Sequence, residues 1–245
     1  MIIFDEKKYA ENMLKKGFQT KHKNVYELYI LSKYFRTICE DDQEVKDKLI
    51  KFSEKYIEHF NIDEWYKIIN KAVSASKKGK LITDKIVNIT LNELNVIQEL
   101  ESLNEQKVAF TLLVLYKFYD YKKFEVSIED LYRLCKLNIN SKTKLKVLQS
   151  LTSKELIDIT MGGKRWVNFT DKKSDPAITI KDFDDYIYEY LRYIGEDGLS
   201  ECEVCNKAIK VRGRNHKMCK GCSDTNRQMQ NKEKSLKYYH KNKQK

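Results

Sequence analysis

Apolar residues recur at three- and four-residue steps through most of the first 76 positions, the periodicity of helices that bury one face. Two such stripes are Val25, Leu28, Leu31, Phe35 and Ile38, and then Val45, Leu49, Phe52, Tyr56 and Phe60. The acidic run at 40–42 between them suits a helix start, because carboxylates favour the positive end of the helix dipole. The pattern breaks at 77–80, so residues 1–80 are predicted to form a small helical bundle.

The pattern changes from helical to alternating between residues 83 and 170. Helices are predicted at 83–102, 105–119, 128–135 and 141–152, with a short extended piece at 124–126. The last helix is expected to bury Leu145, Leu148 and Leu151. Two alternating segments, 156–160 and 165–169, flank Gly162-Gly163 and predict a β-hairpin.

This order of helix, strand, helix, short turn, helix and hairpin resembles the winged helix-turn-helix domains of bacterial and phage DNA-binding proteins. The resemblance implies a domain at 83–171, with 141–152 as the recognition helix and Gly162-Gly163 as the wing tip. The DNA contacts that it implies are Lys142, Lys144, Lys146 and Gln149 on the helix and Lys164 and Arg165 on the wing. A domain of this kind that only packs against other proteins, with solvated lysines, is the alternative.

A boundary is predicted at 171–177, which holds the only proline, Pro176. The next segment, 178–196, is predicted to be a connecting helix. Four tyrosines are expected to give it exposed anchors for a partner, namely Tyr186, Tyr188, Tyr190 and Tyr193. A glycine-containing break at 195–198 then leads into a last module at 199–245.

Four of the six cysteines form a C-x2-C-x13-C-x2-C pattern made of Cys202, Cys205, Cys219 and Cys222. Two turns that each present two thiolates complete the tetrahedral shell of a structural Zn²⁺ ion. A redox dithiol pair is the alternative. His216 lies between the pairs and is expected to be a polar loop residue, since four thiolates already fill the shell. Cys39 and Cys135 lie in helical patterns and are expected in the core.

The cysteine turns followed by a basic helix, predicted to start at Ser223 or Asp224, resemble a treble-clef or zinc-ribbon module. Five basic residues of this module are predicted to lie near phosphates: Arg212, Arg214, Lys217, Lys220 and Arg227. The module also resembles the cysteine frame of some phage HNH nucleases, but no catalytic histidine run follows it. The four histidines form no local pair, and P-loop, G-x-S-x-G and HExxH motifs are missing, so no enzyme is expected.

Charge is distributed unevenly along the chain. The net charge is +11, and residues 201–245 hold 13 lysines and arginines against 4 acidic residues, which leaves +2 for the first 200 positions. A nearly neutral body with a basic tail favours an acidic polymer as partner, although a solubilising tail is the alternative. The N-terminus lacks the apolar core of a secretion signal and no stretch is long enough to span a bilayer, so a cytoplasmic protein of a bacterium or a phage-infected host is expected.

The expected fold is therefore mainly α, with a helical bundle, a winged helix with a β-hairpin wing, and a four-cysteine zinc module followed by a basic helix. The expected function is non-enzymatic, sequence-specific binding of double-stranded DNA by a phage or mobile-element regulator or replication accessory factor. The alternative is an adaptor or host-takeover factor that binds a nucleic-acid-processing protein of replication or transcription. RNA or single-strand binding by the basic zinc region is a third hypothesis, and a homodimer is compatible with each.

Overall fold

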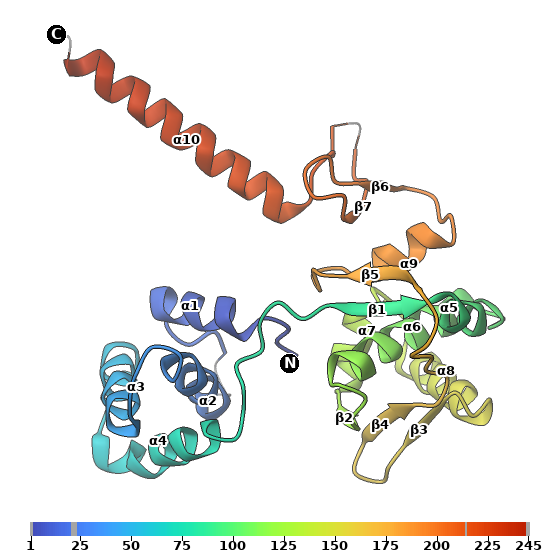
Figure 1. Cartoon of the computed structure of the whole chain (residues 1–245), viewed down its shortest axis with the longest axis horizontal. Coiled ribbons are helices and arrows are strands. Elements are labelled where there is room, and N and C mark those ends of the chain that lie inside the picture. The colour runs from blue at the N-terminus through green and yellow to red at the C-terminus, as the bar shows by residue number, and fades with distance from the viewer. Residues whose placement is uncertain (1, 21–23, 214, 244–245) are drawn as a thin grey trace. The chain divides into compact units, whose positions relative to one another are not determined.

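The computed structural model describes residues 2–20, 24–213 and 215–243, and the chain divides into two compact units, 2–85 and 86–245 (Figure 1). Each unit has its own arrangement of elements. No described helix combines the length and the apolar character needed to cross a membrane.

The described residues of the first unit form four helices, in line with the predicted helical bundle: α1 (Glu6–Lys16), α2 (Asn24–Phe35), α3 (Asp42–Tyr56) and α4 (Ile62–Ser76). Side chains cap three of them, because the oxygens of Asp5, Asp41 and Asn61 accept backbone N–H groups of the first turn. The core between the helices includes Leu28, Leu31, Leu49, Val45 and Ile69, all buried.

A buried ion pair fastens the end of this unit to its start. The ammonium group of Lys33 donates to the Glu6 carboxylate, and both side chains are buried. The same carboxylate accepts the backbone N–H of Ile82 at 2.8 Å. The segment after α4 is thereby held against α1 and α2.

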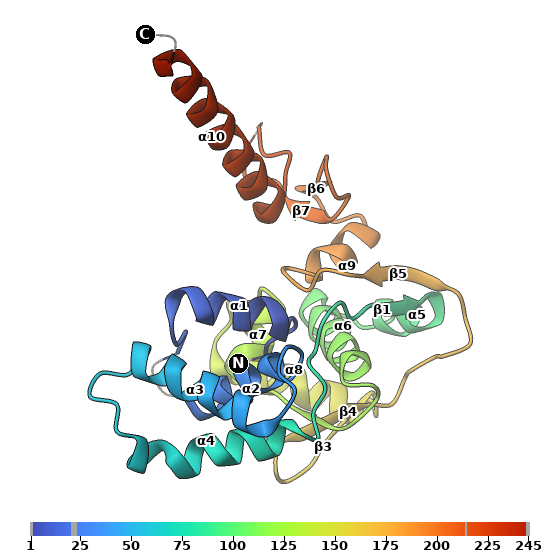
Figure 2. The ribbon, with the colours of Figure 1, turned by 60° about the vertical axis from the view of Figure 1, so that its left-hand side comes forward.

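The second unit is built around α6 (Leu103–Phe118), which contacts α5 (Leu91–Gln98), α7 (Ile128–Leu134), α8 (Ser141–Ser153) and α9 (Ile187–Tyr193). The residues of α6 from Val108 to Leu115 are all buried. A helix that is apolar on every side is typical of a core helix, and Figure 2 shows α6 among the elements that cover it.

A three-stranded antiparallel sheet accompanies α7 and α8. Its order is β2 (Phe124–Glu125), β4 (Lys164–Val167) and β3 (Ile157–Ile159). The predicted hairpin is confirmed, because β3 pairs with β4 and Ile157 lies opposite Val167. Gly163 has φ 76°, a left-handed conformation that glycine adopts without strain in such a turn.

The predicted helices at 83–102 and 178–196 are wrong in part. Residues before α5 form a strand, β1 (Val87–Thr90), which pairs antiparallel with β5 (Pro176–Ile180). The predicted connecting helix is therefore correct only for α9. Pro176 is the first residue of its strand, a position that tolerates the missing N–H.

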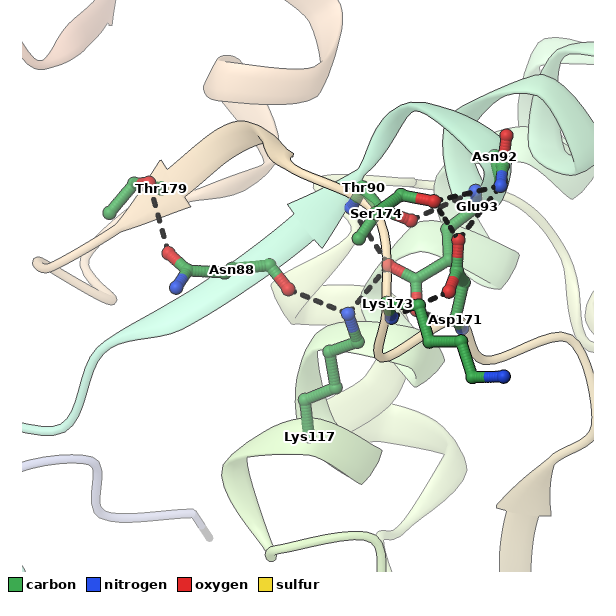
Figure 3. Close-up of polar contacts among 9 residues, drawn as sticks. All are labelled: Asn88, Thr90, Asn92, Glu93, Lys117, Asp171, Lys173, Ser174 and Thr179. Atoms are coloured by element: carbon green, nitrogen blue, oxygen red, sulfur yellow. Dashed lines mark hydrogen bonds and ion pairs between the residues drawn. The ribbon is translucent and has the colours of Figure 1, made fainter.

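A buried polar network holds this strand pair to the core (Figure 3). The Glu93 carboxylate accepts the backbone N–H of Thr90 at 2.9 Å and of Asp171 at 2.8 Å. Lys117 on α6 donates to Glu93 at 2.6 Å and to the carbonyl of Asn88 at 2.6 Å. One carboxylate thus caps α5, fixes the chain before β5 and neutralises a buried ammonium.

The last part of the unit comprises β6 (Leu199–Glu201), β7 (Ala208–Lys210) and α10 (Lys220–Lys243), with β6 and β7 antiparallel. Both strands contact α9, and the backbone N–H of Ala208 donates to Glu189 at 2.8 Å. Helix α10 begins at Lys220, earlier than the predicted Ser223 or Asp224, so that Cys222 lies within its first turn.

Candidate functional site

The four cysteines at 202, 205, 219 and 222 form one cluster, in which all four Sγ atoms lie within 4.8 Å of one another. Cys205 Sγ and Cys219 Sγ are 3.8 Å apart. Four sulfurs placed tetrahedrally about 2.3 Å from a metal ion would be about 3.8 Å apart, whereas bonded sulfurs lie about 2.05 Å apart. The cluster therefore has the geometry to hold a metal ion.

Backbone conformation brings the first cysteine pair together. The chain turns at Asn206, which has φ 58°, in the left-handed region that asparagine tolerates better than most residues. The N–H of Asn206 donates to the carbonyl of Cys202 at 2.9 Å, and the N–H of Cys202 donates to that of Lys207 at 2.9 Å. This closed turn presents both sulfurs on one side.

The second pair is positioned by the start of α10. The N–H of Cys222 points at the Sγ of Cys219 at 3.4 Å, and the N–H of Ser223 donates to the carbonyl of Cys219 at 2.9 Å. The Sγ of Cys219 thus accepts one of the N–H groups that are left without a partner at the start of every helix.

The thiols of the cluster differ in acidity. Burial raises the pKa of Cys202, but N–H groups of Cys219, Cys205 and Val204 outweigh it and lower that pKa to about 6. Contacts with the sulfurs of Cys219 and Cys205 raise the pKa of Cys222 to about 12. Four crowded thiolates coexist only when a cation neutralises them, and thiolates are the form that binds metals.

The other candidate ligands lie elsewhere. His216 Nδ1 accepts the backbone N–H of Arg212 at 3.3 Å and so closes the loop between the cysteine pairs, as expected for a polar loop residue. Cys135 is buried in the core, and burial raises its pKa to about 12. Cys39 is half-buried beside the core of the first unit.

Helix α8 exposes three of the four side chains predicted to contact DNA. Lys142, Lys146 and Gln149 are exposed. Lys144 is half-buried, and its Nζ lies 5.4 Å from the centre of the Tyr132 ring. The Tyr132 hydroxyl also donates to the carbonyl of Lys144 at 2.6 Å, which ties this turn of α8 to α7.

The predicted buried face of α8 is wrong at one position. Val147, Leu148 and Leu151 are buried, whereas Leu145 is 51% exposed. Leucines at three-residue steps rotate by about 60° per step around a helix with 3.6 residues per turn, so Leu145 lies about 120° from Leu151. Val147 takes its place in the core. The rotation of about 60° per three-residue step was visible in the sequence and would have placed Leu145 outside the buried face.

Only one of the two hairpin side chains that are predicted to contact DNA is exposed. Lys164 is exposed, whereas Arg165 is only 6% exposed, and this burial disfavours the predicted DNA contact of Arg165. The Arg165 guanidinium donates to the carbonyls of Val126 and Gly163. Alternation along β4 turns Arg165 inward with Val167, a two-residue period visible in the sequence.

Replacing Arg165 with methionine should therefore destabilise the second unit and have no separate effect on nucleic-acid affinity. The carbonyls of Val126 and Gly163 would lose their buried donor, at a cost of about 1–3 kcal/mol. Urea unfolding of Arg165→Met measures this cost. Lys164→Ala is the matched control, with an expected change within about 0.5 kcal/mol. An Arg165→Met protein of unchanged stability would contradict this assignment.

The predicted basic residues of the cysteine module have different surroundings. Arg212, Lys220 and Arg227 are exposed, and Arg214 lies outside the described residues. Lys217 is also exposed, but it forms an ion pair with Glu203 at 2.9 Å that raises its pKa. Part of its charge is therefore already compensated within the module.

Two of the four tyrosines at 186–193 are core residues, so the prediction of exposed anchors is wrong for these two. Tyr186 and Tyr190 are buried, and their rings lie 6.5 and 4.9 Å from that of Phe110. The Tyr190 hydroxyl donates to Gln106 at 2.9 Å. Tyr188 is half-buried, and Tyr193 is exposed. The four-residue step from 186 to 190 places both rings on the face of α9 that packs on α6.

Comparison with known proteins finds no matching family model, no matching curated protein and no matching solved structure. The features that bear on function are the cysteine cluster and the exposed faces of α8, the hairpin and α10.

Proposed function

We propose that the chain is a non-enzymatic, sequence-specific binder of double-stranded DNA, in which residues 104–170 act as a winged helix and α8 enters the major groove. The observation that carries the proposal is the exposed face of α8. It presents Lys142, Lys146 and Gln149, and the helix contains no acidic residue. Lysine side chains neutralise phosphates, and both lysine and glutamine side chains donate hydrogen bonds to base edges.

The placement of lysines on α8 favours an anionic ligand. Cations near the start of a helix oppose its dipole, yet Lys142, Lys144 and Lys146 all lie in the first two turns. Helices α3, α4 and α7 carry acidic residues in the first turn instead. Binding of a polyanion offsets the unfavourable placement on α8.

The surrounding elements support the same proposal. A short turn joins α7 to α8, and the β3–β4 hairpin follows with Lys164 exposed beside its turn. In the winged helix-turn-helix proteins that this order resembles, the second helix reads the groove and the hairpin contacts the backbone. By that resemblance, the role is that of a phage or mobile-element regulator or a replication accessory factor.

The metal in the proposal is Zn²⁺ with a structural role. Four thiolates are a soft ligand set that suits zinc, and they leave no coordination position open for water. The ion would join the turn at Cys202–Cys205 to the start of α10. Lys220 and Arg227, both exposed, would then be presented from a fixed helix start to DNA phosphates.

The proposal predicts a salt-dependent effect of two lysines one helical turn apart. In the metal-loaded full chain, Lys142→Ala with Lys146→Ala should weaken duplex binding. It should also reduce the slope of log affinity against log salt by about 0.9 for each lost phosphate contact. Fluorescence anisotropy between about 50 and 200 mM salt measures both quantities. Competition with single-stranded DNA and RNA of equal length tests the preference for duplex.

A matched control is available in the first unit. Lys67 and Lys71 have the same four-residue spacing on α4 and are also exposed. Their double alanine variant should keep both the affinity and the slope. Absence of binding at low salt, or equal losses in the two double variants, would contradict DNA binding through α8.

A second candidate function, that of an adaptor for a nucleic-acid-processing protein, is favoured by α10. Met229 and Leu236 lie two turns apart on one face of this helix and are 54% and 58% exposed. This stripe suits an apolar groove of a protein partner. The adaptor hypothesis predicts a stoichiometric partner that survives nuclease treatment and is lost with Met229→Lys and Leu236→Lys. DNA binding alone predicts no such partner.

A further inference from the structure

An apolar side chain lies at one edge of the basic face of α8, next to Gln149 and Lys142. Leu145 is 51% exposed, although leucine is expected in the core at this position. Lys142 precedes it by three residues and Gln149 follows it by four, and both are exposed. Residues three and four apart share a helix face, so Leu145 belongs to the surface that α8 offers to its ligand.

A leucine side chain cannot form an ion pair or a hydrogen bond with a phosphate. It also cannot bind a base edge that presents only hydrogen-bonding groups. The major groove offers one apolar group, the 5-methyl of thymine, and apolar side chains read it by contact. We infer that Leu145 is a specificity-determining residue that contacts a thymine methyl, so that the preferred ligand is duplex DNA with thymine at this position. This inference rests on the proposed DNA-binding function.

The neighbours of Leu145 extend the predicted site. Gln149 is four residues further along α8, which is about 6 Å, or close to two base-pair steps. Glutamine pairs with adenine through two hydrogen bonds in the major groove. Lys142 and Lys146 lie to one side of Leu145 around the helix and carry the charge that attracts phosphates there. The recognised sequence should therefore contain a thymine and, within about two base pairs, an adenine.

Charge favours DNA over a protein as the occupant of this face. An isolated exposed leucine needs no explanation by itself. Leu145, however, is bordered by Lys142 and Lys146 on a helix without acidic residues, whereas an apolar protein groove would have to desolvate both ammonium groups. The major groove accepts the lysines and the leucine together.

The test compares thymine with deoxyuridine, which lacks only the methyl group. A duplex selected by the metal-loaded full chain is remade with deoxyuridine at one thymine at a time. At one position the wild-type affinity should fall about fourfold, which corresponds to the roughly 0.8 kcal/mol of one buried methyl group. Leu145→Ala should bind the thymine duplex about as weakly as the wild type binds the deoxyuridine duplex, and deoxyuridine should have no further effect on it.

Leu91 provides the matched control, since it is 50% exposed at the first position of α5. Leu91→Ala should retain the fourfold discrimination. Wild-type protein that binds a defined sequence but tolerates deoxyuridine at every position would overturn the inference and leave the proposed function standing. A Leu145→Ala protein that still discriminates thymine from deoxyuridine would also overturn the inference and leave the proposed function standing. Wild-type protein that binds no duplex would overturn both.

Discussion

Removal of the proposed metal ion from the cysteine cluster should unfold β6, β7 and the first turn of α10, while helices α1 to α4 stay folded. The module has two strands of three residues each and few buried apolar side chains beyond Ala208 and Ile209. Structural zinc supplies an apparent binding free energy of about 10–16 kcal/mol in small modules, so the proposed ion should be the main source of stability here.

Hydrogen exchange of the chain before and after treatment with a chelator measures this effect, and elemental analysis should give one zinc per chain. Cys219→Ser should abolish stoichiometric binding, because Cys219 is one of the four proposed ligands and its Sγ also accepts the N–H of Cys222 in the first turn of α10. Cys39→Ser is the control, since Cys39 lies in the first unit, and should keep one zinc. Unchanged protection of 199–219 without metal would contradict this role.

Lys117→Met should destabilise the second unit by about 3–5 kcal/mol. The substitution leaves the carboxylate of Glu93 buried without its counter-ion, and breaking one side of a buried pair costs this much. The carbonyl of Asn88 would lose its donor as well. Urea unfolding followed by near-ultraviolet circular dichroism, which reports the aromatic core around Phe110, measures the change.

The ion pair between Arg133 and Asp130 is the control for Lys117. Its N–O distance is 2.7 Å, but the arginine side chain is 61% exposed, so that Arg133→Met should cost at most about 1 kcal/mol. Equal effects of the two substitutions would show that the Glu93–Lys117 network does not hold β1 and α5 to the core.

Local patterns in the sequence predict the helices and the cysteine cluster well. The four-residue steps through Val45, Leu49 and Phe52 repeat over several turns, and α3 buries all three. Each cysteine pair lies in a tight turn, which its two-residue spacing predicts. Cys205 and Cys219, which are 14 residues apart, have their Sγ atoms 3.8 Å apart. The hairpin is also local, because Gly163 supplies the left-handed residue of its turn.

Features that depend on distant partners are not visible in the sequence. Strand β1 has four residues beside a helical stretch, and its partner β5 lies some ninety positions later, with Asn88 opposite Thr179. Nothing near Val87 signals that pairing. The burial of Tyr186 and Tyr190 likewise depends on Phe110 of α6.

The central claim, that α8 reads duplex DNA, is tested most directly by selecting bound fragments from random duplexes with the metal-loaded full chain. The account predicts an enriched motif with a thymine and a nearby adenine. It also predicts that Lys146→Ala with Gln149→Ala loses the adenine of this motif but keeps the thymine assigned to Leu145, while α10 retains a salt-sensitive, sequence-independent affinity. A pool without any enriched motif, or the same motif recovered by the double variant, would contradict the claim.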